Sequence, residues 1–482
     1  MPRKNGVIVW RDGLTVPDLK NSNLQTVNSA TRSSRAAQVV STLLAALFIS
    51  ASSSCGGGSS KTTLGTGAPP PPNLTPSAFF GMHVHDATTP FPAGYGISGV
   101  RLWDTQTAWA TTNTSDGQYD WTNLDSRVNQ ATSNSVDVLY DFGRTPGWAQ
   151  CSNSSPTCGS GDTTVVCAYS AEGGSGQCFP PNDLNVDGTG TNQHWINWVT
   201  AVVTRYKGQI KFYEIWNEPN NAINWQGTTA QLVRMTQDAR CIISGTECNS
   251  SSTYSQKGID TSAQILTPAF ADHDLDTTLE AYLAAGGAKY SDVVAFHGYP
   301  GLNPPEQIQQ IAAHVVGLAG VGSKPVFNTE GSWGVDVPIT DPDQQAAFVS
   351  RYILVQQSAG VQKFYWYAWD GSGVNLWTSS GLNSAGVAFT QMVVWTTGVT
   401  ITSRCTPSGT VWTCGYTRSG GYQAQAVWDT SRTCNAGSCS TSSFSPGSQF
   451  KQYLDVAGNK VTVNGSVPIG AKPILLETGD IP

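Results

Sequence analysis

The sequence predicts an α/β fold, a (β/α)8 TIM barrel followed by a small C-terminal antiparallel β-domain of sandwich type. Eight short apolar runs alternate with segments of helical period between residues 78 and 398. The runs are apolar throughout, which is typical of parallel strands covered on both faces. After residue 399 the helical periods disappear and Gly, Thr and Ser become more frequent. A chain of 482 residues has room for a barrel of about 250 residues and for further domains.

Each predicted barrel strand is a short run of aliphatic and aromatic residues. The runs are residues 79–85, 98–104, 136–143, 210–218, 263–269, 292–299, 324–330 and 362–370. Helical periodicity predicts helices at residues 195–206, 230–243, 276–287, 305–320 and 344–357. Asp341 and Pro342 form a favourable helix start, because the aspartate caps the helix and proline fits its first turn. In the predicted β-domain, residues 399–482, short runs predict strands that pack on the barrel.

The N-terminal segment has the features of an export signal rather than of a folded domain. Arg32 and Arg35 precede an apolar stretch of about 13 residues, 39–51, which is too short to span a bilayer. Cys55 follows small residues, as at a bacterial lipoprotein cleavage site. We therefore expect residues 1–55 to be a signal peptide of lipoprotein type, with membrane attachment through lipidated Cys55. Plain secretion with an unpaired Cys55 is the alternative.

Residues 56–77 are a Gly/Ser- and Pro-rich sequence, which predicts a flexible linker. The protein is thus expected to be exported, as a cell-envelope lipoprotein or a secreted protein. The cysteines agree with an oxidising compartment. There are eleven, and without Cys55 the remaining ten fall into local groups. The groups are Cys151, Cys158, Cys167 and Cys178; Cys241 and Cys248; Cys405 and Cys414; Cys434 and Cys439.

This even number predicts five disulfides, with the pairing within the first group left open. Zinc binding is the competing interpretation, but no CxxC pair or His cluster supports it. The net charge of −7 comes without any basic run, which argues against a nucleic-acid partner. No metal or other cofactor is expected.

The stretch "FYEIWNEP", residues 212–219, begins as a buried strand and ends in an amide, a carboxylate and a proline. Active sites of such barrels lie at the C-terminal ends of the strands. Glu218 ends the fourth predicted strand and Glu330 ends the seventh. Two carboxylates at the mouth of a barrel can carry out glycoside hydrolysis, one as the acid and the other as nucleophile or base. The partner would then be a polysaccharide or oligosaccharide substrate.

The motif WNEP, together with a Glu that ends strand seven, resembles the retaining glycoside hydrolases of clan A. The stretch "FPPNDLNVDGTGTNQHWINWVTAVVTRYKGQIKFYEIWNEPNN" is most similar to family 39, which includes β-xylosidases and bacterial exopolysaccharide endoglycosidases. "FFGMHVH", "GVRLWDTQTAWA" and "YDFGRTPGWAQ" resemble the endoglycosidases most. The resemblance covers residues 78–398 and implies a retaining enzyme.

The resemblance also implies residue roles. Glu218 would be the general acid/base and Glu330 the nucleophile, while Asn217 would hold the sugar 2-hydroxyl. Arg101 would hydrogen-bond the nucleophile and keep it ionised. Tyr299 would orient Glu330, and His297 would line the same subsite. Barrel packing without a catalytic role is the alternative for Arg101 and Tyr299.

Other candidates follow from strand position. Glu214 is expected deeper in the barrel than Glu218, as the buried partner of a basic or amide group. His83 and His85 line the substrate site or are core histidines. Trp369 is preferred over Trp366 as a sugar platform, because it is nearer the strand end. Trp148 and Trp333 follow strands three and seven, where they floor outer subsites or pack the loops.

Three functions therefore remain open. The first is a retaining endo-acting hydrolase that cleaves a β-linked exopolysaccharide by double displacement. The second is an exo-acting β-xylosidase-like enzyme. The third is a non-catalytic carbohydrate-binding barrel, which the loss of either glutamate would favour; both Glu218 and Glu330 are present.

Overall fold

The fold is seen in a computed structural model of the chain. It describes residues 74–481 apart from residues 76, 152–176, 272–274, 319, 336, 338 and 372. The predicted signal segment with Cys55, most of the linker, Cys158 and Cys167 lie outside the described residues. Within the described part of the chain, no helix is long and apolar enough to cross a bilayer.

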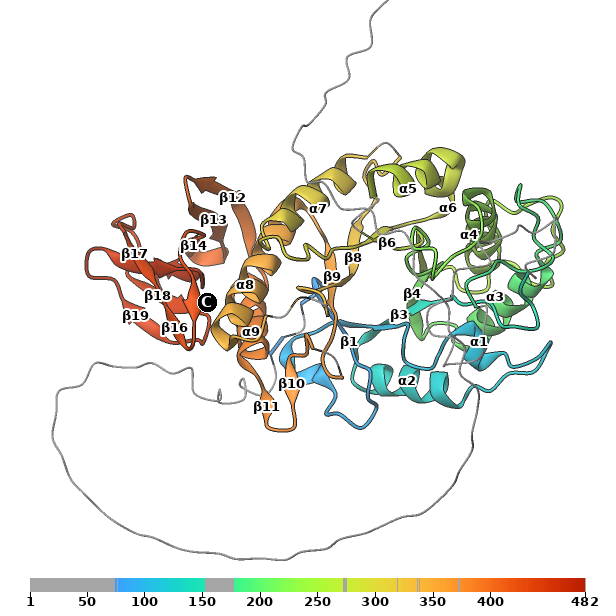
Figure 1. Cartoon of the computed structure of the whole chain (residues 1–482), viewed down its shortest axis with the longest axis horizontal. Coiled ribbons are helices and arrows are strands. Elements are labelled where there is room, and N and C mark those ends of the chain that lie inside the picture. Colours follow the sequence, from blue (N-terminus) through green and yellow to red (C-terminus); the bar gives the residue numbers. More distant parts are fainter. Residues whose placement is uncertain are drawn as a thin grey trace, which may run out of the picture. The chain divides into compact units, whose positions relative to one another are not determined.

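Nine short parallel strands form the barrel, which confirms the predicted fold class (Figure 1). Their order in the sheet is β5-β4-β3-β2-β1-β9-β8-β7-β6. The strands are β1 Phe80–His83, β2 Gly99–Leu102, β3 Asp137–Asp141, β4 Ile210–Glu214, β5 Gln264–Leu266, β6 Phe270–Ala271, β7 Val294–His297, β8 Val326–Gly331 and β9 Lys363–Trp366.

The barrel closes because β5 and β6 are two halves of its fifth strand. β5 pairs with β4, and β6 pairs with β7. Parallel bridges between Leu266 and Val293 and between Asn217 and Ala269 connect each half to the opposite neighbour as well. The nine segments thus correspond to the eight predicted strands.

Helices cover the outside of the barrel, and all five predicted helical segments are present. The helices are α1 Trp109–Thr112, α2 Thr122–Ser133, α3 Gln193–Arg205, α4 Thr229–Ser244, α5 Leu275–Tyr282, α6 Ala288–Tyr290, α7 Gln307–Gly317, α8 Pro342–Ala359 and α9 Ser384–Thr396. A π-helical segment, Leu283–Gly287, joins α5 to α6. Asp341 caps α8 by accepting hydrogen bonds from the backbone N–H groups of Asp343 and Gln344, as predicted. The structure adds α1, α2, α6 and α9, which were not among the predicted segments.

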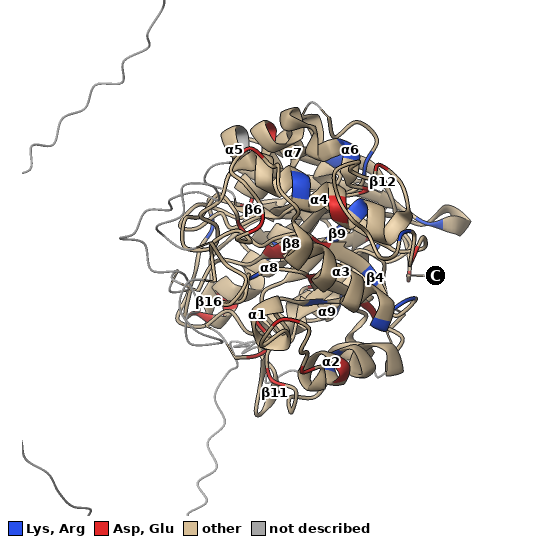
Figure 2. Cartoon of the chain, turned by 90° about the vertical axis from the view of Figure 1, so that its right-hand side faces the viewer, with Lys and Arg blue, Asp and Glu red and all other residues tan. Residues whose placement is uncertain are grey.

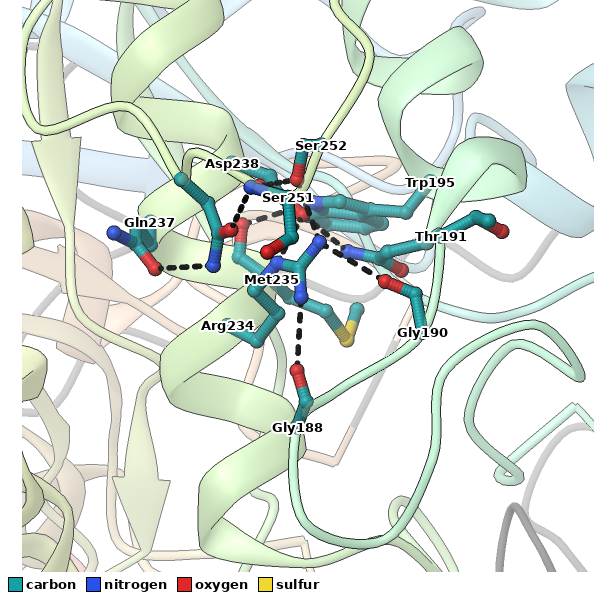
Figure 3. A network of polar contacts seen from close by, with 12 residues as sticks. Gly188, Gly190, Thr191, Trp195, Arg234, Met235, Gln237, Asp238, Ser251 and Ser252 are labelled. Atoms are coloured by element: carbon teal, nitrogen blue, oxygen red, sulfur yellow. Dashed lines mark hydrogen bonds and ion pairs between the residues drawn. The ribbon is translucent and has the colours of Figure 1, made fainter.

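The long connection between β3 and α3 is attached to α4 by a buried polar network (Figure 3). Arg234 donates to the carbonyls of Gly188 and Gly190, and its Nε lies 2.9 Å from Asp238 Oδ2. Ser252 also donates to Asp238. Buried charges are tolerated when they are paired and hydrogen-bonded. This network fixes the chain that follows the cysteine-rich residues 151–178.

Antiparallel sheets follow the barrel, in agreement with the predicted β-domain. The main sheet has the order β12-β13-β14-β21-β18-β19. Its strands are β12 Thr400–Ser408, β13 Val411–Thr417, β14 Gln423–Asp429, β18 Gln452–Asp455, β19 Lys460–Thr462 and β21 Ile474–Glu477. Two further pairs are β15 Cys434–Asn435 with β16 Ser438–Cys439, and β17 Thr441–Phe444 with β20 Val467–Gly470. Val427, Val467 and Leu476 belong to a separate apolar core between these strands.

A partly buried ion pair lies at the seam between the barrel and the β-domain. Arg351 of α8 binds Glu306, just before α7, through two hydrogen bonds of 2.6 Å. Trp428 of β14 donates its indole N–H to the same carboxylate at 2.7 Å. The three side chains thus connect the loop before α7, α8 and the β-domain.

Three disulfides join described cysteines: Cys241–Cys248, Cys405–Cys414 and Cys434–Cys439. Cys151 and Cys178 are disulfide-bonded as well. These bonds agree with the predicted use of the cysteines.

Candidate active site

The barrel interior consists of an apolar layer with a polar layer above it. Leu139, Phe212 and Ala295 belong to a buried cluster inside the barrel. Alternate residues of a strand point to the same face. Two residues further along the same strands stand Asp141, Glu214 and His297, so the polar layer begins where the apolar core ends. Figure 2 shows that most residues of the chain are uncharged, and that the acidic and basic residues are scattered among them.

Arg101 of β2 is the centre of the polar layer and is fully buried. Its Nε donates to Glu214 at 2.7 Å, Nη1 to Glu330 at 2.8 Å and Nη2 to Asn217 at 2.8 Å. Burial opposes the guanidinium charge, but Glu214, Glu330 and Asp141 together raise the pKa of Arg101. Glu214 is therefore the buried partner of a basic group, as the sequence analysis predicted.

Glu330 stands near the end of β8 with both carboxylate oxygens bound. Arg101 binds Oε2, and the Tyr299 hydroxyl donates to Oε1 at 2.7 Å. The pairing of β7 with β8 shifts between Phe296–Asn328 and His297–Glu330, so that β8 contains one extra residue. This bulge brings Glu330 level with His297 and directs its side chain to the polar layer.

Glu218 lies beyond the end of β4 in a left-handed backbone conformation, with φ of 42°. Residues other than glycine seldom adopt such a conformation, and those that do cluster at functional sites. The Glu218 carboxylate lies 2.9 Å from His297 Nδ1 and accepts a 3.2 Å hydrogen bond from Asn224. Oxygens of Glu218 and Glu330 and a nitrogen of His297 lie within 4.8 Å of one another.

Burial has the largest influence on the pKa values of Glu330, His297 and Tyr299. It raises the pKa of Glu330 above its ordinary value, although His297 and Arg101 act in the opposite direction. Burial lowers the pKa of His297 to about 4, so this imidazole is neutral near pH 7. Burial, together with the Glu330 charge, raises the pKa of Tyr299 well above its usual range, which keeps the phenol protonated as a donor.

A second polar cluster borders the carboxylate pair. His85 Nε2 lies 2.9 Å from Asp104 Oδ2, and His85 Nδ1 lies 3.1 Å from the Asp370 carbonyl. Burial opposes the charge of His85, but the nearby Asp104 and Asp370 raise its pKa overall. Tyr367 donates to Asp104 at 2.8 Å. His83 binds the Thr329 carbonyl from the same region. Thr329 is the residue before Glu330, so this hydrogen bond places the cluster next to that carboxylate.

Two groups of described residues have a spacing that could hold a metal ion. They are His83, His85 and Asp104, and Glu218, His297 and Glu330. The histidines and carboxylates of both groups already have hydrogen-bond partners within this chain.

Trp369 and Trp366, the two tryptophans weighed as a sugar platform, are buried and contact other tryptophan rings. Trp369 is 1% exposed, donates to the Pro90 carbonyl and stacks on Trp377. β9 ends at Trp366, so the alternation of side chains along a strand does not extend to residue 369. Trp366 itself packs against Trp333 in the core between the sheet and the helices.

Trp148 is half-buried above the barrel. Its indole donates to the Asn113 carbonyl at 2.9 Å, and its ring packs edge-on against His194. Its indole N–H therefore serves loop packing.

Sequence reasoning missed Asp104, Tyr367, Asn224 and Asp141. Asp104 ends the second predicted strand, so the rule that selected Glu218 and Glu330 could have found it. Tyr367 immediately follows β9. It lies two residues before Trp369, the residue that the sequence analysis preferred as a sugar platform. Asn224 lies in an irregular loop, and no sequence pattern marks it. Asp141 falls within an apolar run of the sequence. Only its register with Glu214 on β4 shows that it belongs to the polar layer.

Solved structures that are similar to this chain include glycoside hydrolases of two families. A family 39 glycoside hydrolase from Bacteroides cellulosilyticus WH2 aligns with a TM-score of 0.58 at 14% identity, over 83% of this chain and 81% of that chain. A family 30 endoxylanase from Clostridium papyrosolvens C71 aligns at 0.51 and 13%, over 84% and 97%. A monomeric β-xylosidase from Caulobacter crescentus CB15 aligns at 0.53 and 14%, over 84% and 97%.

These likenesses support the fold, a TIM-like barrel followed by antiparallel β-sheets. The neighbours include members of both family 39 and family 30, all at low identity. No known family profile and no curated protein sequence matches the chain.

Proposed function

We propose that the protein is a retaining glycoside hydrolase that cleaves a β-linked extracellular polysaccharide. The observation that carries the proposal is the closeness of two glutamates at the end of a glycosidase-type barrel, with oxygens within 4.8 Å of each other. Carboxyl groups about 5 to 5.5 Å apart suit direct attack on the sugar, whereas inverting enzymes need about 6.5 to 9.5 Å to admit a water.

Glu330 is the nucleophile in this proposal. Arg101 and Tyr299 hold its two oxygens, which fixes the carboxylate for attack on the anomeric carbon. As the bond forms, the charge of Glu330 is lost to the glycosyl ester. Arg101 remains beside Glu214, so the guanidinium keeps a counter-charge through the step.

Glu218 is the general acid and then the general base. It protonates the leaving oxygen in the first step and removes a proton from the attacking water in the second. His297 Nδ1 lies 2.9 Å from Glu218 Oε1. Because this imidazole is neutral near pH 7, it places no positive charge beside Glu218. The Asn217 oxygen accepts from Arg101, which leaves its amide N–H groups to donate to the sugar 2-hydroxyl.

The test is a screen of the protein against a panel of β-linked polysaccharides, with sizing of the products. Long products at early times support endo action, and release of single sugars supports the exo-acting β-xylosidase alternative. Glu330→Ala is expected to be inactive. Azide is expected to rescue Glu218→Ala partly on an activated aryl glycoside, because that substrate needs no acid for its first step. If both variants keep wild-type rates on the substrate found, the assignment fails.

We also propose that the enzyme is exported and anchored through lipidated Cys55, on the basis of the sequence signals. Membrane fractions of the producing cell should then contain the protein, and Cys55→Ser should release it. A fully soluble wild-type protein would contradict the anchor.

A further inference from the structure

One guanidinium faces three carboxyl groups, and two of these, Glu214 and Asp141, are closed to solvent. Arg101 and Glu214 are 0% exposed and Asp141 is 1% exposed. Arg101 binds Glu214 and Glu330 directly, and its Nη2 lies 3.6 Å from Asp141 Oδ2. Three ionised carboxylates would leave two uncompensated negative charges, which a buried site does not tolerate.

Two oxygens show where a proton would fit. Asp141 and Glu214 are register partners on the parallel strands β3 and β4. Asp141 Oδ1 accepts from Gly143 N at 2.8 Å, and Glu214 Oε2 accepts from Arg101. Asp141 Oδ2 and Glu214 Oε1 are buried and lack a hydrogen-bond partner among the described residues. Ionised carboxylates only accept, so a single shared proton satisfies both oxygens.

We propose that Asp141 is a protonated carboxylic acid that donates to Glu214, and that this acid pair is a positioning element that holds Arg101 against Glu330. The proposal rests on the proposed function only for the role of Glu330. The pKa of Asp141 agrees with it, because burial and the Glu214 carboxylate raise that pKa well above its ordinary value. Arg101 from β2 and the Gly143 N–H oppose the rise. Glu330 from β8 faces the pair through Arg101.

The shared proton leaves Arg101 with two counter-charges, Glu214 and Glu330. When Glu330 becomes esterified, the remaining Arg101–Glu214 pair is electrically balanced. An ionised Asp141 would instead compete with Glu330 for the same guanidinium. The neutral acid therefore directs Arg101 to the nucleophile.

Infrared spectroscopy of the whole protein tests the proton without any need for activity. In a Glu218→Gln background, which removes the catalytic acid, the spectrum near pH 7 is expected to contain the carbonyl stretch of a buried carboxylic acid. Asp141→Asn in that background should abolish this band. Identical spectra with and without Asp141→Asn would overturn the proposal, whether or not the enzyme is a glycosidase.

Kinetics test the positioning role. Asp141→Ala should lower kcat at least tenfold with little change in KM, because Arg101 loses its orientation. Asp141→Asn should restore kcat to within threefold of wild type, since its amide N–H can donate to Glu214 as the acid does. Asp137→Asn is the matched control on the same strand, where Asp137 pairs with Lys211 near the surface. An Asn variant as impaired as the Ala variant would contradict the role.

Discussion

The barrel mouth and the seam with the β-domain both contain arginine–glutamate pairs shielded from solvent wholly or in part, yet the two pairs are built differently. At the seam, Arg351 and Glu306 are matched one to one, and Trp428 completes the hydrogen bonds of the carboxylate. At the mouth, Arg101 is shared between Glu214 and Glu330, with Asp141 close by.

The difference separates an ion pair that holds structure from one that can react. At the seam, one positive and one negative group bind each other through two hydrogen bonds. At the mouth, burial and, after it, neighbouring negative charges raise the pKa of Glu330 and of Asp141. Perturbed pKa values of this kind cluster at functional sites.

The largest expected effect is on activity at the mouth. Glu330→Gln removes the proposed nucleophile, so kcat should fall by about 10^4-fold or more. Burial of the Glu330 charge also opposes folding, since a raised folded-state pKa means that stability is lost as pH rises through that pKa. Chemical denaturation at pH 7 should therefore find the variant at least as stable as wild type. A strongly destabilised Glu330→Gln would assign this glutamate to the fold.

The seam should show the opposite behaviour. Glu306→Gln leaves the partly buried Arg351 without its counter-charge, which should cost up to about 3 to 5 kcal/mol of unfolding free energy, the range for a fully buried pair. The rate on an aryl glycoside should stay within twofold of wild type under native conditions. The double variant Glu306→Leu, Arg351→Met is the control, because a buried pair replaced by apolar residues recovers most of that stability. A loss of activity without a loss of stability would break the comparison.

The pH profile of kcat/KM gives a third, smaller effect. The nucleophile must be ionised, so activity should fall as the pH falls through the pKa of Glu330. Because burial raises that pKa, the acid limb should lie above the ordinary value of 4.5. Glu306→Gln should leave the limb in place. An acid limb below pH 4.5 would show that Glu330 is not held in the environment described.

The smallest effect concerns a single hydrogen bond at the seam. Trp428→Phe keeps the aromatic packing but removes the indole donor to Glu306, which should lower the unfolding free energy by about 1.5 to 3 kcal/mol. Trp412→Phe, in the ring stacked on Trp428, is the control and keeps that hydrogen bond. Equal losses in both variants would attribute the effect to packing alone.

Sequence reasoning located the features that depend on local pattern. The apolar runs gave the barrel, and strand ends gave Glu218 and Glu330, because both follow from periodicity and from the known edge of such barrels. The sugar-stacking roles expected for Trp369 and Trp148 stay predictions, because the direction of a side chain after a strand ends does not follow from the alternation along the strand. The bulge in β8 that turns Glu330 to His297, and the register that places Asp141 beside Glu214, become visible only in three dimensions.

The most direct test of the central claim is proton NMR of the first product formed from a substrate of known anomeric configuration. Attack by Glu330 followed by attack of water makes two inversions at the same carbon. The account therefore predicts that the β-anomer appears first and that the α-anomer accumulates only later, by mutarotation. Initial formation of the α-anomer would show a single displacement by water, and it would contradict the roles given to Glu218 and Glu330.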